Sequence, residues 1–267
     1  MRIRTLFLSD IHLGYRGCRA GALLDFLGRY QPDEIILVGD VVDLWSLRRT
    51  PYWPAEHQAV VRRFVQLAAS GVRVIYVPGN HDEAIREWVG ASLAGVEIRQ
   101  EHHHVLADGR RFLVMHGDAF DDAVRIPGWL SGLGSFLYDC ILALSHHVYG
   151  LRRRLFRGAR WFSLATWIKR RVPEAMRYVR KFENAAVQEA KRRGFDGIIC
   201  GHIHHPALQE RDGICYVNDG DWVEHGTAVF EHLDGHLELH WADEAPAVQP
   251  APRLAPAMPV AALRKVA

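Results

Sequence analysis

The stretch Leu6-Phe7-Leu8-Ser9-Asp10-Ile11-His12 decides the fold, because it runs from an apolar strand straight into two side chains that can bind a metal. Residues 3–8 are alternating and apolar, which predicts a buried first strand. Asp10 and His12 are separated by one residue, so on an extended segment they point the same way. We therefore expect this strand end to present a carboxylate and an imidazole side by side.

Four more polar blocks follow predicted strands: Gly39-Asp40-Val41-Val42-Asp43, Gly79-Asn80-His81-Asp82, His116-Gly117-Asp118 and Gly201-His202-Ile203-His204. The strands in front of them are predicted at residues 34–38, 72–77, 110–115 and 196–200. Strand ends in open α/β sheets converge on one crevice, so the blocks should meet there. The glycines before Asp40, Asn80 and His202 would allow tight turns that deliver the next side chain to it.

The blocks together supply seven candidate metal ligands: Asp10, His12, Asp40, Asn80, His116, His202 and His204. Carboxylate, imidazole and amide oxygen suit Mn, Fe or Zn. Cysteine is absent from all five blocks, which argues against a structural zinc site. Any one block could be a chance turn, but five blocks that each end a strand favour a metal site.

The order of predicted elements favours an α/β architecture. Helical spacing at residues 19–30 and 54–70 alternates with the early strands, which is typical of an α/β domain. Later strands are joined by Asp108-Gly109 and Asp234-Gly235, both strong hairpin signals. We predict two mixed sheets packed as a sandwich with helices outside. The run His102-His103-His104 lies in the first hairpin and is expected to be exposed and not ligating.

The chain divides into three compositional regions. Residues 1–121 and 195–243 contain the predicted strands and should form the core. Residues 122–194 lack convincing strands and are aromatic and basic, which predicts an inserted helical cap. Residues 244–267 are rich in Ala and Pro and should form an extended tail without a core of its own.

Charge and composition narrow the class of protein. The net charge is only +2, yet residues 125–193 hold 15 Lys and Arg against 4 Asp and Glu, which suits phosphates or an anionic membrane surface. No apolar run is long enough to span a bilayer, and no signal peptide is visible. Four scattered cysteines fit reduced thiols, so we expect a cytoplasmic protein.

The order of the five blocks resembles the calcineurin-like metallophosphoesterase superfamily. The resemblance implies a four-layer αββα sandwich and two divalent metal ions. One metal would take Asp10, His12, Asp40 and His204, and the other Asp40, Asn80, His116 and His202, with Asp40 bridging. Such a pair lowers the pKa of a bridging water, which then attacks phosphorus.

Two further residues take catalytic roles by the same resemblance. His81 would stabilise the transition state or protonate the leaving oxygen. Asp43 would orient His81, although a carboxylate at that position could also simply cap a helix or loop.

A narrower resemblance is to the UDP-2,3-diacylglucosamine hydrolase family of lipid A biosynthesis, carried by the compact core, the insertion after His-Gly-Asp and the closing Gly-His-x-His. It implies manganese-dependent cleavage to UMP and 2,3-diacylglucosamine 1-phosphate by a peripheral protein at the cytoplasmic face of the inner membrane. Substrate contacts would come from Asn80, His81, Asp122 and His202. Two departures stand out: the family commonly has Arg where this chain has His81, and Asp122 lies closer to His116 than its counterpart does.

Two other functions stay open at this point. One is a phosphodiesterase or phosphatase that acts on a different lipid-linked or nucleotide substrate. The other is a nucleic-acid-binding protein that uses the basic cap. The apolar content of the cap favours lipid, so we expect no nucleic acid as partner. The residues leave the oligomeric state undetermined.

Overall fold

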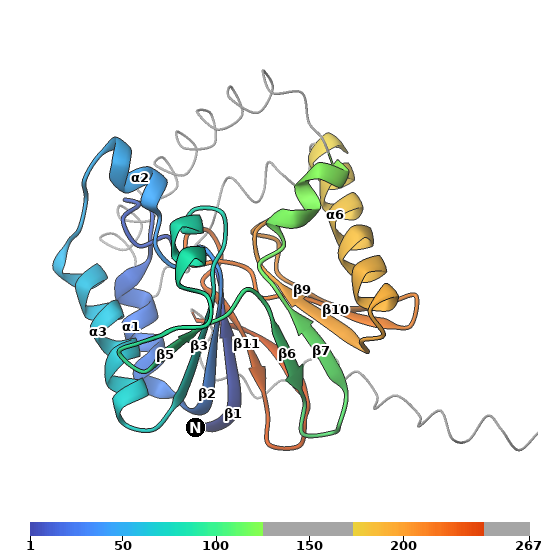
Figure 1. The fold of residues 1–267 in the computed structure, drawn as a ribbon, viewed down its shortest axis with the longest axis horizontal. Helices are drawn as coiled ribbons and strands as arrows, with labels where there is room; N and C mark the ends of the chain where they lie inside the picture. Colours follow the sequence, from blue (N-terminus) through green and yellow to red (C-terminus); the bar gives the residue numbers. More distant parts are fainter. Residues whose placement is uncertain (125–172, 243–267) are drawn as a thin grey trace, which may run out of the picture.

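Two β-sheets lie face to face between two layers of helices (Figure 1). The computed structural model describes residues 1–124 and 173–242. The first sheet has the order β12 (Leu237–Trp241), β11 (Thr227–Glu231), β1 (Arg2–Leu8), β2 (Gln31–Val38), β3 (Arg73–Val77), β5 (Val96–Ile98) and β4 (Ser92–Leu93). The second has the order β6 (His102–Val105), β7 (Arg111–Val114), β8 (Gly197–Cys200), β10 (Ile214–Asn218) and β9 (Ala207–Arg211).

Helices cover both outer faces of the sandwich. The first sheet is covered by α1 (Ala20–Arg29) and α3 (Ala55–Ala69), and the second by α6 (Pro173–Arg192). A short helix α2 (Leu44–Arg49) and two 3-10 turns, η1 (Glu83–Trp88) and η2 (Asp118–Val124), lie in the connections. The α/β sandwich predicted from the sequence is therefore confirmed as four layers.

Three apolar cores hold the layers together. The inner core joins the two sheets, with Phe7, Ile36 and Val77 from the first facing Phe112 and Val217 from the second. The outer cores seat α1 and α3 on the first sheet and α6 on the second. Each central strand has one face in the inner core and the other in an outer core. This explains why its sequence is a continuous apolar run.

Strand direction places the polar blocks at one end of the sandwich. Strands β1, β2 and β3 run parallel to one another, and β7 runs parallel to β8. Because parallel strands end at the same edge, the loops that follow them meet there.

The structure agrees with most predicted elements. Both hairpins are confirmed, with Gly109 and Gly235 at positive φ. The short strands β4 and β5, the edge strand β9 and the helix α2 were not predicted. They are short, and β9 is only partly buried, so neither apolar periodicity nor a long apolar run marks them.

The proposed division of the chain stays a prediction. Residues 125–172 of the expected cap and residues 243–267 of the expected tail lie outside the described part of the structure. Residues 173–192 form α6, whose Phe182, Val187 and Ala190 pack on the second sheet. None of the helices in the described ranges is both long and apolar enough to cross a bilayer.

The expectation that all three hairpin histidines are exposed is wrong for two of them. The side chains alternate along β6, so His102 and His104 turn inward and are buried, whereas His103 is exposed. His104 Nε2 lies 2.7 Å from the buried carboxylate of Glu231 on β11, in the facing sheet. His102 Nδ1 accepts a hydrogen bond from Arg99 (3.0 Å). These partners make burial of two imidazoles tolerable.

Candidate metal centre and active site

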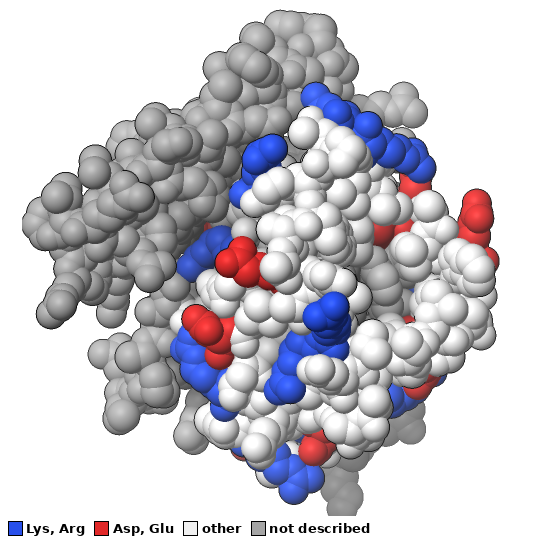
Figure 2. All heavy atoms as spheres, turned by 90° about the vertical axis from the view of Figure 1, so that its left-hand side faces the viewer, with Lys and Arg blue, Asp and Glu red and all other residues white. Residues whose placement is uncertain are grey.

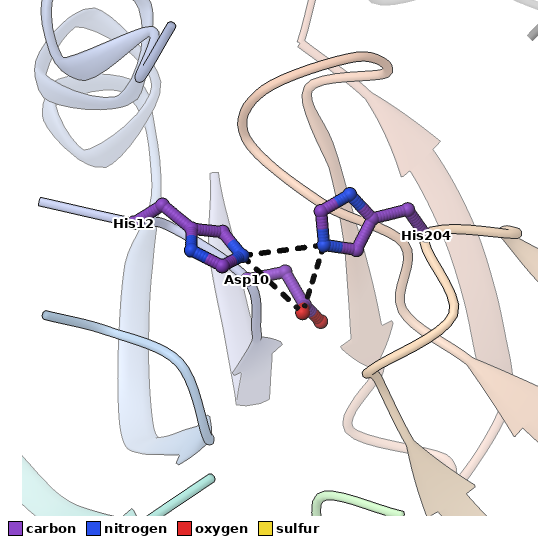
Figure 3. Close-up of side chains that lie close together, drawn as sticks. All are labelled: Asp10, His12 and His204. Atoms are coloured by element: carbon purple, nitrogen blue, oxygen red, sulfur yellow. Dashed lines mark hydrogen bonds and ion pairs between the residues drawn. The ribbon is translucent and has the colours of Figure 1, made fainter. Parts of the chain in front are cut away.

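The first group of candidate ligands joins the loops after β1 and β8. Asp10 Oδ1 lies 3.1 Å from His204 Nε2, and His12 Nε2 lies 3.2 Å from the same nitrogen (Figure 3). The distance from His12 Nε2 to Asp10 Oδ1 is 3.7 Å. Three donor atoms from distant parts of the sequence thus face one point, as a metal site requires.

A second group lies beside the first. Asp40 Oδ2 is 3.3 Å from His116 Nε2, and these two residues form a potential ligand group with His202. The same Asp40 oxygen lies 3.9 Å from His12 Nε2, in the first group. Asp40 therefore stands between the groups, where a bridging carboxylate would have to be.

Unpaired buried atoms show that the site fits divalent cations. Asp10 Oδ1, Asn80 Oδ1 and His116 Nε2 are all buried and make no hydrogen bond, although Asp10 Oδ1 and His116 Nε2 lie at ion-pair distance from other candidate ligands. Leaving such atoms unpaired is costly, and a cation that accepts their lone pairs removes the cost. All three belong to the ligand set predicted from the sequence, and Asn80 joins the carboxylates and imidazoles through its amide oxygen.

The backbone at the ligands differs from the extended geometry that the sequence suggested. Five of the seven candidate ligands have positive φ: Asp10 (49°), His12 (55°), Asp40 (53°), His202 (69°) and His204 (48°). Residues other than glycine rarely adopt this region, and clusters of such residues are typical of functional sites. The side chains converge because the chain turns sharply after each strand.

Glycines next to the ligands make room for them. Gly39 has φ of +87°, as a tight turn requires. Gly79 and Gly201 have no positive φ, but a Cβ at Gly79 would lie 2.3 Å from Asp40 Oδ1, and one at Gly201 would lie 2.3 Å from Asp10 Oδ2. At these two positions glycine is needed for space and not for backbone angle.

The electrostatics favour a cation. Burial opposes ionisation of Asp10, but the neighbouring His204 and His12 hold its pKa well below the usual range. Burial likewise opposes ionisation of Asp40, but His116 lowers its pKa. Although burial disfavours a charged His116, the carboxylates of Asp40 and Asp10 raise its pKa to about 10. The metal-free centre thus holds protons on imidazole that an entering cation would displace.

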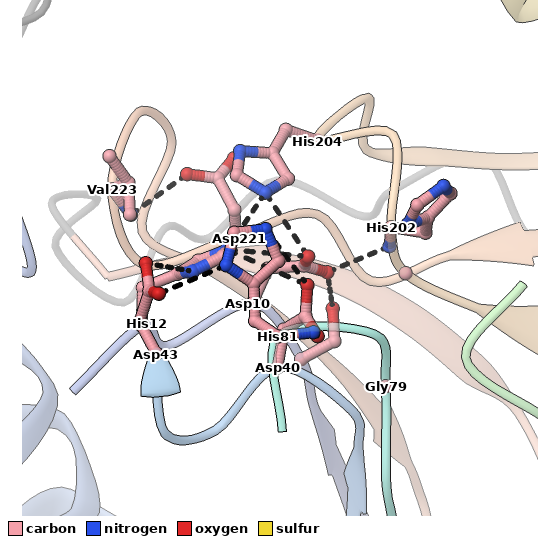
Figure 4. A network of polar contacts seen from close by, with 12 residues as sticks. Asp10, His12, Asp40, Asp43, Gly79, His81, His202, His204, Asp221 and Val223 are labelled. Carbon is pink, nitrogen blue, oxygen red and sulfur yellow. Dashed lines mark hydrogen bonds and ion pairs between the residues drawn. The ribbon is translucent and has the colours of Figure 1, made fainter. Parts of the chain in front are cut away.

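Asp43 serves two histidines and a helix. Its carboxylate lies 3.2 Å from His12 Nδ1 and 3.0 Å from His81 Nδ1 (Figure 4). It also caps α2 by accepting a hydrogen bond from Ser46 N (2.7 Å). Asp43 therefore both contacts the two histidines and caps the helix, while its role in orienting His81 stays a prediction. The ring of His81 packs on Trp45, with centroids 4.2 Å apart.

Asp82, from the third block, holds the loop that carries Asn80 and His81. Its carboxylate accepts hydrogen bonds from Gly79 N (2.6 Å) and Val41 N (2.7 Å), and from the hydroxyl of Tyr76. The side chain is fully buried. Asp82 thus ties the turn after β3 to the turn after β2.

Asp219 is a buried acid behind Asp10 that no sequence motif marks. Ser9 Oγ lies 2.6 Å from both Asp10 Oδ2 and Asp219 Oδ1. Burial, and the charge of Asp10, raise the pKa of Asp219 well above its usual range. A neutral Asp219 can donate to Ser9, whose hydroxyl then donates to Asp10.

The acidic residue that reaches the site from η2 is Asp121. Its Oδ1 lies 2.9 Å from His202 Nε2. The sequence had singled out the neighbouring Asp122, whose side chain lies outside the described part of the structure. Asp122 already lies closer to His116 than its counterpart in the family, and Asp121 lies closer still, so the spacing gave no signal for Asp121.

A four-layer sandwich with two Asp- and His-lined ligand groups at its strand ends defines a metal-dependent phosphohydrolase. The chain belongs to the calcineurin-like phosphoesterase family, whose sequence profile matches residues 3–206. It is 30% identical over 249 residues to the UDP-2,3-diacylglucosamine hydrolase of Xanthomonas campestris, covering 86% of this chain and 96% of that protein. It is 27% identical over 211 residues to the Escherichia coli protein of the same name, covering 77% and 84%.

Among solved structures, the chain resembles Yfce, a phosphoesterase from E. coli, at 15% identity and a TM-score of 0.44. That match covers 87% of this chain and 90% of the other.

Proposed function

We propose that this enzyme hydrolyses UDP-2,3-diacylglucosamine to UMP and 2,3-diacylglucosamine 1-phosphate, a step of lipid A biosynthesis. The observation that carries the proposal is the similarity to relatives bearing that name, which extends over 86% of this chain and 96% of theirs. Similarity of that extent is not confined to the short metal blocks. The two ligand groups supply the chemistry that such a reaction needs.

The seven candidate ligands would hold two divalent cations, which we propose are manganese. Asp10, His12 and His204 contribute to one ion, His116, Asn80 and His202 to the other, and Asp40 to both. Bound there, the cations supply Lewis-acid activation of water and neutralise charge on the phosphate oxygens.

His81 is proposed as the proton donor to the leaving oxygen. Its Nδ1 lies 3.0 Å from Asp43 Oδ1, so this carboxylate pairs with the Nδ1 side of the ring. That leaves Nε2 to carry the proton that moves. His81 Nε2 lies 4.0 Å from Asp40 Oδ2, so this nitrogen stands beside the ligand groups.

Substrate contacts are proposed from Asn80, His81, Asp122 and His202. The basic and apolar residues between 125 and 193 would meet the acyl chains and an anionic lipid surface, which gives a peripheral protein at the cytoplasmic face of the inner membrane. The site itself lies at the ends of the strands that flank this insertion, next to η2 and α6.

The test is release of UMP from UDP-2,3-diacylglucosamine by manganese-loaded protein in mixed detergent micelles. UMP formation that is abolished in Asp40→Asn supports the proposal. Hydrolysis of a simple substrate such as bis(p-nitrophenyl) phosphate without any release of UMP would contradict it.

A different lipid-linked or nucleotide substrate is the second candidate function, favoured by His81 at the position where the hydrolase family commonly has Arg. A third, nucleic-acid binding, gains no support from the face turned to the viewer in Figure 2. Within the described residues there, Lys and Arg form small separate groups with acidic side chains between them, and most of the basic cap lies outside the described part of the structure. Duplex DNA binding needs several clustered cations.

A further inference from the structure

Asp121 and His202 form a contact that links η2 to the metal centre. Asp121 Oδ1 lies 2.9 Å from His202 Nε2, while the backbone nitrogen of His202 donates to Asp10 Oδ2 at 2.9 Å (Figure 4). His202 is thus fixed at two points, its backbone by a ligand of the first group and its ring by an acid outside both groups. The side chain of His202 is only 11% exposed.

The contact decides which ring nitrogen of His202 can bind a metal. A carboxylate at neutral pH only accepts hydrogen bonds, so His202 Nε2 must carry the hydrogen that Asp121 accepts. The lone pair is then on Nδ1, and only this nitrogen is available to a cation shared with Asp40 and His116. Ligating histidines in metalloproteins are commonly oriented by a carboxylate in this way.

Asp121 is itself held by a second residue. The hydroxyl of Tyr178 on α6 donates to Asp121 Oδ1 at 2.9 Å. Figure 1 shows η2 beside α6, and Phe120 of η2 packs edge-on against Phe182 of α6, with centroids 5.6 Å apart. The chain Tyr178–Asp121–His202 therefore runs from the outer helix layer to the metal centre.

We propose that Asp121 is a positioning residue for the metal shared by Asp40, His116 and His202: it selects Nδ1 of His202 as the ligand atom, and Tyr178 steadies its carboxylate. Asp121 acts through His202 and touches no reacting atom. The proposal concerns the metal centre alone, so it stands whichever substrate the enzyme uses.

The test is manganese affinity of the full chain, measured by isothermal titration with the metal alone. Asp121→Asn leaves an amide that can present its nitrogen to His202, so the tautomer is no longer imposed. We expect the weaker of the two manganese sites to lose about 10- to 100-fold in affinity, as is usual when a carboxylate behind a ligating histidine is removed. Tyr178→Phe should cause a smaller loss, about fivefold, since one hydrogen bond is removed.

Matched variants separate positioning from general charge and from folding. Glu189→Gln removes a carboxylate from α6 that pairs with Arg192, away from the candidate ligands, and should leave manganese affinity unchanged. Asp121→Glu keeps an acceptor and should recover part of the affinity. Unchanged circular dichroism and melting temperature of metal-free Asp121→Asn would show that the fold is intact.

Two results would overturn the proposal. If Asp121 holds His202 away from the metal, manganese will bind more tightly to Asp121→Asn than to the unaltered chain. If the contact has no role at the metal, Asp121→Asn will match Glu189→Gln at both sites.

Discussion

Asp43 Oδ1 lies 3.0 Å from Nδ1 of His81, while the other oxygen of the same carboxylate lies 3.2 Å from Nδ1 of His12. Burial opposes ionisation of Asp43, but its hydrogen bonds to these two histidines lower its pKa, so it is ionised at neutral pH. One carboxylate thus orients a candidate metal ligand and the candidate proton donor together.

His81→Ala tests whether His81 is the proton donor or one of the metal ligands. The variant should bind two metal ions and lose about 10²- to 10⁴-fold in kcat, which is the usual contribution of a positioned acid or base. Metal content by plasma mass spectrometry and turnover of the same samples check both halves. His103→Ala, at an exposed imidazole far from the ligands in sequence, is the control. Loss of a metal ion in His81→Ala would instead make His81 a ligand.

Asp43→Asn removes the charge but keeps the helix cap, because Asn caps helices as well as Asp does. We expect the melting temperature to change little, while kcat falls about 10- to 100-fold as both His12 and His81 lose their carboxylate. Ser46→Ala, which deletes only a hydroxyl donor to Asp43 (2.8 Å), should have a much smaller effect. Equal kcat in Asp43→Asn and the unaltered enzyme would leave Asp43 as a cap alone.

Gly79→Ala tests the space around Asp40. The added Cβ would lie 2.3 Å from Asp40 Oδ1 and 2.7 Å from His116 Cδ2, so it must displace candidate ligands. We expect loss of metal binding, seen by titration. Gly28→Ala is the matched control: it lies in α1 with nothing within 4 Å of the new Cβ, and should raise the free energy of unfolding by about 0.5–1 kcal/mol. Normal metal affinity in Gly79→Ala would mean that the loop carrying Asn80 can shift to accommodate the added methyl group without moving the ligands.

His102 should make stability depend on pH. Burial, followed by the charges of His104 and Arg99, lowers the pKa of His102 to about 4. Below pH ~6.5 the imidazole of His102 is protonated in the unfolded chain but stays neutral in the folded chain. The free energy of unfolding therefore falls as the pH drops from ~6.5 to ~4.

His102→Gln should remove that part of the pH dependence, about 1–2 kcal/mol of unfolding free energy across this range. Urea denaturation of both proteins at several pH values measures the difference. Curves that stay parallel from pH 7 to pH 4 would show that His102 does not carry this proton linkage.

The layers could be predicted from the sequence, and the candidate ligands could be singled out, because each block directly follows a strong apolar strand, as with Asp10 after residues 3–8. It could not predict what depends on the third dimension. Asp121 and Asp219 are acids without a motif, and only packing of α6 and the 218–221 turn brings them to the centre. The burial of His104 depends on Glu231, a partner 127 residues away.

The positive φ of the ligands was also beyond the sequence. Asp10 and His12 read as a continuation of β1, and nothing in their residue types signals a left-handed turn. Only the tertiary contacts that follow, such as His12 N donating to Asp40 O (2.9 Å), impose it. Local pattern therefore predicted which residues would meet, and the loop contacts determine how.

The number of manganese ions bound per chain tests the central claim most directly. Equilibrium dialysis should give two ions per unaltered chain. Asp40→Asn should bind fewer than one, because Asp40 stands between both ligand groups. A single ion per unaltered chain, or two ions retained by Asp40→Asn, would contradict a dinuclear centre bridged by Asp40.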